Sequence, residues 1–426
     1  MGVGAFVNQS NRPAAVGPAR RARFSTGDLV LVASIVALCI FGLVVLYSAS
    51  TDFSFLVNDG DATFIFRKQL LWLAIGSVVA VVFSRIDYHL WRQMALPLMG
   101  ITVILLIAVQ INNEVRLNAV RSLFRGSVQP SELAKLAIIV YLSVWLYAKR
   151  EVLHDLQLGL IPLASILGLM GGFIYQQPDL SAAITIFLLG GLLFFLAGGD
   201  LRQIVMFAVV AGLVGLVVVQ FSSTGRDRIA NYLAGLKDPL HSGEHVMWSL
   251  EAVYRGGFFG VGIGNASTKL IGLPFAATDS IFAVVVEELG LFGAMALTGL
   301  YGMFLWRGLK IASRAPDSLG AVLAAGLTFW IVIEAFINMA VMVGLLPFAG
   351  NALPFISAGG SNLISSLGAI GILLSISRQS GTKSPEKPAA RPDTQERRTY
   401  GASVDLRRRD RRRGLSRARR PAGPAR

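Results

Sequence analysis

The sequence predicts an all-α protein that crosses a membrane about ten times. Hydrophobic residues make up 54% of the chain and charged residues only 15%, whereas a soluble domain carries about 25% charged residues. The mean hydropathy is +0.61. Apolar runs of about 20 residues, the length that crosses the hydrocarbon as a helix, recur along the chain. The single cysteine, Cys39, excludes an intrachain disulfide and a zinc site built from cysteines.

Ten apolar runs are long enough to be spanning helices, which satisfy their own backbone hydrogen bonds in lipid. An even number of spans places both ends of the chain on the same side of the membrane. A large polar loop, 222–280, separates the seventh and eighth spans, and we expect it on the outer face. The predicted spans are 29–50, 69–84, 94–111, 132–148, 159–175, 181–198, 203–221, 281–304, 319–344 and 358–377.

Both ends of the chain are basic. Residues 378–426 hold 16 Lys and Arg against 5 Asp and Glu, and four arginines precede Asp28. Lys and Arg are enriched on the cytoplasmic side of membrane proteins, so we expect both termini in the cytoplasm and a first helix that is retained rather than cleaved. The arginine-rich run 407–413 indicates a tail on anionic lipid rather than nucleic-acid binding, because no nucleic-acid-binding module is recognisable. The predicted domains are a basic cytoplasmic segment 1–27, a transmembrane domain 28–378 and a disordered basic cytoplasmic tail 379–426.

The polar loop ends in Asp279, directly before the eighth span. A carboxylate at a membrane boundary, in a loop rich in cations, is where we expect chemistry on a charged, lipid-linked substrate. The local alternative is that Asp279 only caps the N-terminus of the eighth span. The cationic residues of this loop that we single out are Arg226, Arg228, Arg255 and Lys269.

Polar residues also stand at the starts of the fourth and sixth spans. Glu132 and Lys135 are three residues apart, on one face of a helix. They form either a local ion pair at a capped helix start or part of a polar cavity inside the bundle. Asp179 follows Gln177 and Pro178, and a cap of the sixth helix is the simpler interpretation of its position.

Two stretches are rich in glycine. For residues 256–265 we expect a re-entrant or closely packed backbone segment whose free N–H groups could hold phosphate. Residues 344–362 contain two prolines and paired glycines, which suggests a shaped loop beside a cavity. His241 and His245 fit a zinc-protease spacing, but a proline and a glycine in the same run argue against one helix carrying both ligands. The sequence therefore predicts no metal site there.

Five segments, in this order along the chain, carry a resemblance to a known family. They are QPSELAK at 129–135, QPDLS at 177–181, GGFFGVGIGNASTKL at 256–270, ATDSIFAVVVEELG at 277–290 and GLLPFAGNALPFISAGGSNL at 344–363. With ten spans around them, the sequence resembles the SEDS family (shape, elongation, division and sporulation), whose members include FtsW and RodA. The resemblance covers roughly residues 28–378.

The resemblance implies a peptidoglycan glycosyltransferase that polymerises lipid II at the outer face of the cytoplasmic membrane. Asp279 falls on the essential aspartate of the family, for which the implied role is general base on the acceptor hydroxyl. Two positions depart from the family pattern, Ala277 in place of a histidine and Trp248 in place of a glutamine. The candidates for substrate binding are Gln129, Glu132, Lys135, Asp179, Arg226, Arg228, Arg255, Lys269 and Ser361.

The implied partners are lipid II, a class B penicillin-binding protein that supplies the transpeptidase, and other division or elongation proteins. The long basic tail favours a division role like that of FtsW over an elongation role like that of RodA. No cofactor is predicted with certainty. A divalent cation, Mg²⁺ or Mn²⁺, would assist a leaving diphosphate, but the sequence contains no dedicated cage for it. Two other functions fit the same spans, a transporter that flips the lipid-linked precursor and a catalytically silent scaffold of the division machinery.

Overall fold

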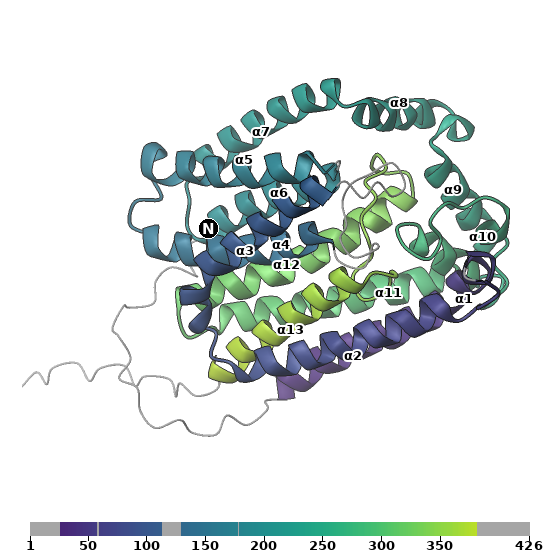
Figure 1. Cartoon of the computed structure of the whole chain (residues 1–426), viewed down its shortest axis with the longest axis horizontal. Coiled ribbons are helices and arrows are strands. Elements are labelled where there is room, and N and C mark those ends of the chain that lie inside the picture. Colours follow the sequence, from purple (N-terminus) through teal and green to yellow (C-terminus); the bar gives the residue numbers. More distant parts are fainter. Residues whose placement is uncertain (1–25, 58, 113–128, 178, 381–426) are drawn as a thin grey trace, which may run out of the picture. The chain divides into compact units, whose positions relative to one another are not determined.

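The computed structural model shows a protein built of helices (Figure 1). Every regular element of the part that the structure describes is helical, which confirms the predicted all-α fold. The predicted basic segment 1–27 and tail 379–426 lie almost entirely outside that part, so these domain limits stay predictions. The described residues are 26–57, 59–112, 129–177 and 179–380.

Each of the ten predicted spans corresponds to a described helix. Nine of the described helices are long and apolar enough to cross a membrane, and the tenth, α6, is a shorter apolar helix of 17 residues. The fifth span begins with a π-helical turn at Leu156–Leu160. The spanning helices are α1 Thr26–Val57, α2 Phe64–Arg85, α3 Leu90–Asn112, α4 Pro130–Lys149, α5 Ile161–Tyr175, α6 Leu180–Leu196, α7 Leu201–Phe221, α11 Ile281–Ser313, α12 Ser318–Met342 and α13 Gly360–Ser380.

The polar stretch between α7 and α11 is largely helical, which the sequence analysis did not predict. The Ser222 hydroxyl oxygen accepts a hydrogen bond from the Gly225 N–H at 3.1 Å and so caps α8. Asp238 caps the next turn, where its Oδ1 accepts from the Leu240 N–H at 3.0 Å. The elements of this stretch are α8 Ser223–Lys237, the 3₁₀ helix η3 Pro239–His241, α9 Glu244–Gly256 and α10 Thr268–Ile271.

The central helices pack closely in pairs, with α2 along α13, α11 along α12 and α3 along α4 (Figure 1). Small residues permit this approach, because a Cβ at Gly371 of α13 would lie 2.5 Å from the Ala80 carbonyl oxygen of α2. By contrast, α7 buries only Gln203 and Phe207 against other described residues. The apolar surface that α7 leaves exposed is the kind that faces lipid.

The glycine-rich stretch packs its backbone directly against α11. The N–H of Val261 donates to the Glu287 carbonyl at 2.9 Å, and the N–H of Leu291 donates to the Gly257 carbonyl at 2.9 Å. A Cβ at Gly260, where φ is +79°, would collide with the backbone of α11. The close packing expected from the sequence is therefore present, and it occupies part of the N–H groups that we considered for phosphate.

The connections between the spanning helices lie at the two ends of the bundle, and hydrogen bonds join connections at the same end. At one end, the Ser357 hydroxyl donates to the Thr278 carbonyl at 2.6 Å, which joins the segment before α13 to the segment before α11. At the other end, the Tyr88 hydroxyl donates to Asp317 Oδ1 at 3.0 Å, which joins the α2–α3 and α11–α12 connections. The end that contains Asp279 thus also contains the loop preceding α13.

Candidate active site

Asp279 lies in a tight turn immediately before α11. Phe275 has φ +52°, and its carbonyl accepts hydrogen bonds from the N–H groups of Thr278 at 2.9 Å and Ser280 at 3.2 Å. The residue at the N-cap of α11 is Ser280, not Asp279. Asp279 therefore does not hold the N-cap position that the simpler interpretation gave it, and its side chain is half-buried.

Hydrogen bonds from distant parts of the chain hold this turn. The Asn338 side chain, on α12, donates from Nδ2 to the Asp279 carbonyl at 2.7 Å and to the Asn351 carbonyl at 2.6 Å. The Ala358 N–H donates to the carbonyl of Ala277 at 2.9 Å. Because three segments are tied together here, the backbone that carries the Asp279 carboxylate has one defined position.

The carboxylate of Asp279 and the guanidinium of Arg228 converge on Gly350. A Cβ built on Gly350 would lie 3.5 Å from Asp279 Oδ2 and 3.9 Å from Arg228 Nη2. Gly350 has φ +64°, so glycine both permits this backbone conformation and leaves room for the two charged groups. Arg228 also lies over the Phe348 ring, with its Cζ 5.5 Å from the ring centroid. An acid and a cation from different segments therefore share one small region.

His245 of α9 borders the same region and was not among the predicted site residues. Its ring stacks on Phe348, with centroids 3.9 Å apart, and on Phe275, with centroids 5.7 Å apart. Nδ1 lies 3.1 Å from the Ser280 hydroxyl oxygen. Burial, together with the charge of Arg228, lowers the pKa of His245 to about 4, so the imidazole is neutral at physiological pH. The zinc-protease spacing that includes His245 gave no hint of this position, because its partners Phe348 and Ser280 lie far away in the sequence.

A cavity of about 390 Å³ opens beside this cluster. Arg228, His245 and Phe348 belong both to its wall and to the surroundings of Asp279. Asp279 itself is not part of the wall. The lining residues are Arg228, Asn231, Tyr232, Gly235, Leu236, Ser242, Gly243, Glu244, His245, Val246, Leu250, Val343, Gly344, Pro347 and Phe348.

Gln129, Asp179 and Ser361 come together at the same end of the bundle. Asp179 Oδ2 accepts from Gln129 Nε2 at 3.0 Å and from the Ser131 hydroxyl at 2.8 Å, and Oδ1 accepts from the Ala182 N–H at 3.1 Å. The Gln129 N–H donates to the Ser361 hydroxyl oxygen at 2.8 Å. Asp179 caps α6, as its position in the sequence suggested, and the group links α4, α6 and α13.

Glu132 and Lys135 lie inside the bundle rather than in the cluster around Asp279. Lys135 Nζ is 2.8 Å from Glu132 Oε2 and also binds Oε1 of Glu334 on α12. Asn362 of α13 donates from Nδ2 to Glu132 Oε2 at 2.9 Å. The local ion pair expected from the sequence is present, and its members are more than 90% buried.

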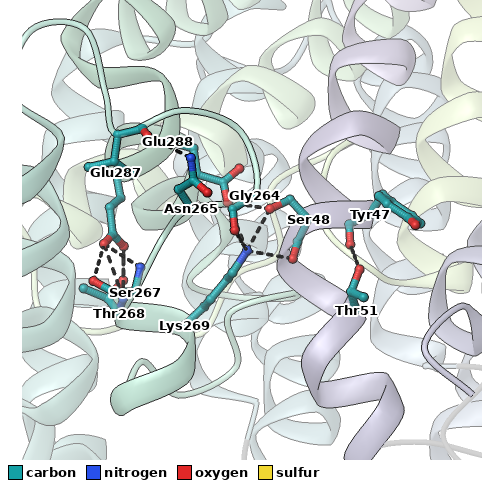
Figure 2. Close-up of polar contacts among 11 residues, drawn as sticks. Tyr47, Ser48, Thr51, Gly264, Asn265, Ser267, Thr268, Lys269, Glu287 and Glu288 are labelled. Atoms are coloured by element: carbon teal, nitrogen blue, oxygen red, sulfur yellow. Dashed lines mark hydrogen bonds and ion pairs between the residues drawn. The ribbon is translucent and has the colours of Figure 1, made fainter. Parts of the chain in front are cut away.

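Lys269 and Arg255 form ion pairs with glutamates and not with Asp279. Lys269 Nζ lies 3.1 Å from Glu288 Oε1 and 2.8 Å from the Ser48 hydroxyl oxygen, so it ties α10 to α1 and α11 (Figure 2). Arg255 pairs with Glu251 at 2.7 Å on α9 itself. Arg226 is exposed on α8, two residues from Arg228. Of the four cations predicted in this loop, the structure therefore brings Arg228 to the carboxylate.

The donors for a divalent cation are sparse. Among the described residues, no three His, Cys, Asp or Glu side chains gather as a metal site. Mg²⁺ is usually held by one or two carboxylates together with substrate phosphates, and Asp279 alone does not form such a cage. We therefore assign no reaction step to a metal.

Comparison with known proteins gives the chain its relatives. A family model described as "Cell cycle protein", covering FtsW, RodA and SpoVE, matches residues 29–382. The "Probable peptidoglycan glycosyltransferase FtsW" of Trichlorobacter lovleyi is 38% identical over 359 residues, which are 83% of this chain and 94% of that protein. "Stage V sporulation protein E" of Bacillus subtilis is 37% identical over 361 residues, 83% of this chain and 97% of that protein.

Two solved structures share the fold. A chain from a structure described as "Structural coordination of polymerization and crosslinking by a peptidoglycan synthase complex" matches with a TM-score of 0.68 and 24% identity, over 84% of this chain and all of that chain. The rod shape determining protein RodA of Thermus thermophilus matches with a TM-score of 0.59 and 23% identity, over 83% of this chain and 97% of that chain. At these identities the likeness concerns the arrangement of the helices.

Proposed function

This chain belongs to the family of cell cycle proteins that includes FtsW, RodA and SpoVE, and we propose that it polymerises lipid II with Asp279 as the general base. It is an integral membrane protein and a peptidoglycan glycosyltransferase, the activity named for its FtsW relatives. The observation that carries the proposal is the convergence of the Asp279 carboxylate and the Arg228 guanidinium on Gly350, beside an open cavity.

In the proposed reaction, the 4-hydroxyl of the acceptor sugar attacks the anomeric carbon of the lipid-linked donor. The carboxylate of Asp279 takes the hydroxyl proton as the new glycosidic bond forms. The bond to the diphosphate breaks, and the diphosphate leaves as an anion that needs no proton. Inversion at the anomeric carbon therefore requires one base only. The positive charge of Arg228 stabilises the charge that develops on the leaving group.

The other predicted substrate contacts divide into two groups. Arg226, exposed on α8, stays a candidate for the diphosphate because it lies on the same helix as Arg228. The remaining residues are engaged in contacts that hold the helices and loops around the site, and for them we propose a supporting role. They are Gln129, Glu132, Lys135, Asp179, Arg255, Lys269 and Ser361.

We place the protein in the cytoplasmic membrane with both termini in the cytoplasm and Asp279 at the outer face. The basic ends of the sequence support this orientation, as does the number of apolar helices in the described part of the chain, which is ten when the shorter α6 is counted. We also propose a class B penicillin-binding protein as partner and a role in division. A structural relative that is a chain of a peptidoglycan synthase complex supports the first of these, and similarity to FtsW supports the second.

The test is polymerisation of lipid II by the purified chain with its partner transpeptidase. Asp279→Asn keeps the backbone anchors of the turn but removes the base, so we expect the rate to fall roughly 100-fold or more. Asp52→Asn is the matched control, an exposed carboxylate on α1, and should leave the rate unchanged. Normal polymerisation by Asp279→Asn would refute the assignment. A wild-type chain that makes no polymer but moves lipid II across vesicles would be a transporter, and one that does neither would be a scaffold.

A further inference from the structure

Three buried polar side chains follow one face of α12 and end at the Asp279 turn. Trp330, Glu334 and Asn338 are spaced four residues apart, so they stack along one side of the helix. Their exposed fractions are 0%, 2% and 2%. Each has one atom without a hydrogen-bond partner among the described residues, namely Trp330 Nε1, Glu334 Oε2 and Asn338 Oδ1. Unpaired polar atoms of this kind destabilise a fold, so three in a row require an explanation.

The charges around Glu334 do not balance if every acid is ionised. Among the described residues, Lys135 is the cation that pairs with these acids, and it binds both Glu132 and Glu334. Tyr301 of α11 also interacts with Glu334, and its neutral hydroxyl donates to the Pro354 carbonyl. Two carboxylates against one ammonium would leave an uncompensated negative charge in the interior, which is very unfavourable. One proton on one of the two acids removes this excess.

The hydrogen-bond partners indicate which acid holds the proton. Glu132 Oε2 accepts from both Lys135 and Asn362, as a carboxylate oxygen does. Glu334 Oε2 accepts from no described group, and on the next turn of α12 Asn338 Oδ1 is a second acceptor without a donor. Two acceptors can pair only if one of them carries a hydrogen.

We propose that Glu334 is a neutral carboxylic acid that positions Asn338 and, through it, the Asp279 turn. The Oε2–H group donates to Asn338 Oδ1. A single proton thereby gives both of these oxygens a partner. The Asn338 amide is then fixed with Nδ2 toward the carbonyls of Asp279 and Asn351, as observed. The protonation state stands by itself, whereas its effect on turnover rests on the proposed function.

Infrared spectroscopy of the purified chain tests the protonation state without any assay of activity. The wild type should show the C=O stretch of a buried, neutral carboxylic acid, shifted in D₂O. Glu334→Gln should lack this band, and Asn338→Leu, which removes the acceptor of the Glu334 O–H group, should keep it at a shifted frequency. Absence of the band in the wild type, its persistence in Glu334→Gln, or an unshifted band in Asn338→Leu would overturn the proposal.

Thermal unfolding gives a second, independent measurement. Glutamine at 334 keeps a donor for Asn338 and an acceptor for Lys135, so Glu334→Gln should melt close to the wild type. Glu334→Leu keeps neither and should melt well below it. Glu132→Gln should also melt lower, because Glu334 must then ionise to balance Lys135 and loses the hydrogen that it donates to Asn338. If Glu334→Gln melts as low as Glu132→Gln, then Glu334 is an ionised partner of Lys135 and the proposal is wrong.

The polymerisation assay then tests the positioning role. Glu334→Leu should lower kcat more than it raises KM, and Glu334→Gln should restore kcat. Equal kcat for wild type and Glu334→Leu would contradict a positioning role. If no form of the chain polymerises lipid II, the proposed function fails, while the infrared result still decides the state of Glu334.

Discussion

At the scale of single residues, Asp279 stands out by how its backbone is anchored. The carbonyls of Ala277, Thr278 and Asp279 accept hydrogen bonds from segments more than 50 residues away in the sequence. A group that must meet a substrate hydroxyl within hydrogen-bond distance needs such a defined position. The anchors all involve backbone atoms of the turn, so replacing the Asp279 side chain leaves them in place.

The neutral state of His245 leads to a prediction about stability and pH. Its folded pKa of about 4 lies below the ordinary value of 6.5, so the unfolded chain binds the proton more tightly. Stability should therefore fall as the pH drops from about 6.5 toward 4, by on the order of 1–3 kcal/mol from this residue. The measurement is the melting temperature of wild type and His245→Gln across this range.

The melting temperature of His245→Gln should fall less on acidification than that of the wild type. Above pH 7 the difference in melting temperature between the two proteins should stay constant. Because other acidic groups also titrate below pH 5, the difference between the two proteins is the quantity to follow. An identical pH dependence in wild type and variant would show that His245 is not held neutral in the fold.

Sequence reasoning identified part of this site and missed the rest for a physical reason. Asp279 and Arg228 were both predicted, because a charge in a polar loop beside a span is visible in the sequence. His245 and Asn338 were not assigned to the site, because their roles depend on partners brought together only by the packing of α9, α11 and α12. The assignment of these residues to catalysis or substrate binding remains a proposal.

At the scale of elements, Lys269 holds α1, α10 and α11 together through Ser48 and Glu288 (Figure 2). Glu288 is only 1% exposed, so removing its cation leaves a buried negative charge with only the Ser48 hydroxyl as its partner. We expect Lys269→Met to cost about 3–5 kcal/mol of unfolding free energy. Thermal denaturation of the purified protein measures this loss.

Arg255→Met is the matched control, since it also removes a cation from this loop. Its pair with Glu251 is more than a third exposed on both sides, so it should cost less than about 1 kcal/mol. If Lys269→Met instead keeps the wild-type melting temperature and raises KM for lipid II, Lys269 contacts the substrate, as first expected from the sequence.

The spanning helices were predictable because a lipid bilayer requires long apolar helices, and long apolar runs are visible in the hydropathy of the sequence. The short helices between α7 and α11 were not. Their signals are the caps Ser222 and Asp238, which are common residues in loops as well, and α8 is only 15 residues long. Short helices gain their stability from packing more than from local sequence. A polar stretch can therefore contain short helices that its sequence does not predict.

At the scale of the whole molecule, the described helices bring the connection between α12 and α13 to the same end as the polar stretch 222–280. Asn338 and Ser357 fasten this end, and the buried group of Lys135, Glu132 and Glu334 lies within the bundle. The order of the spans in the sequence predicted that these segments share one side. It could not predict that α12 connects the interior acid group to the Asp279 turn, because that link depends on the rotation of one helix.

The pH dependence of lipid II polymerisation tests the central claim most directly. If the Asp279 carboxylate is the general base, kcat/KM of the wild type falls on acidification with unit slope as that group takes up a proton. Asp279→Asn should retain a low rate that does not change over the same acid range. If the variant shows the same acid limb as the wild type, the group that titrates is not Asp279 and the proposed mechanism is wrong.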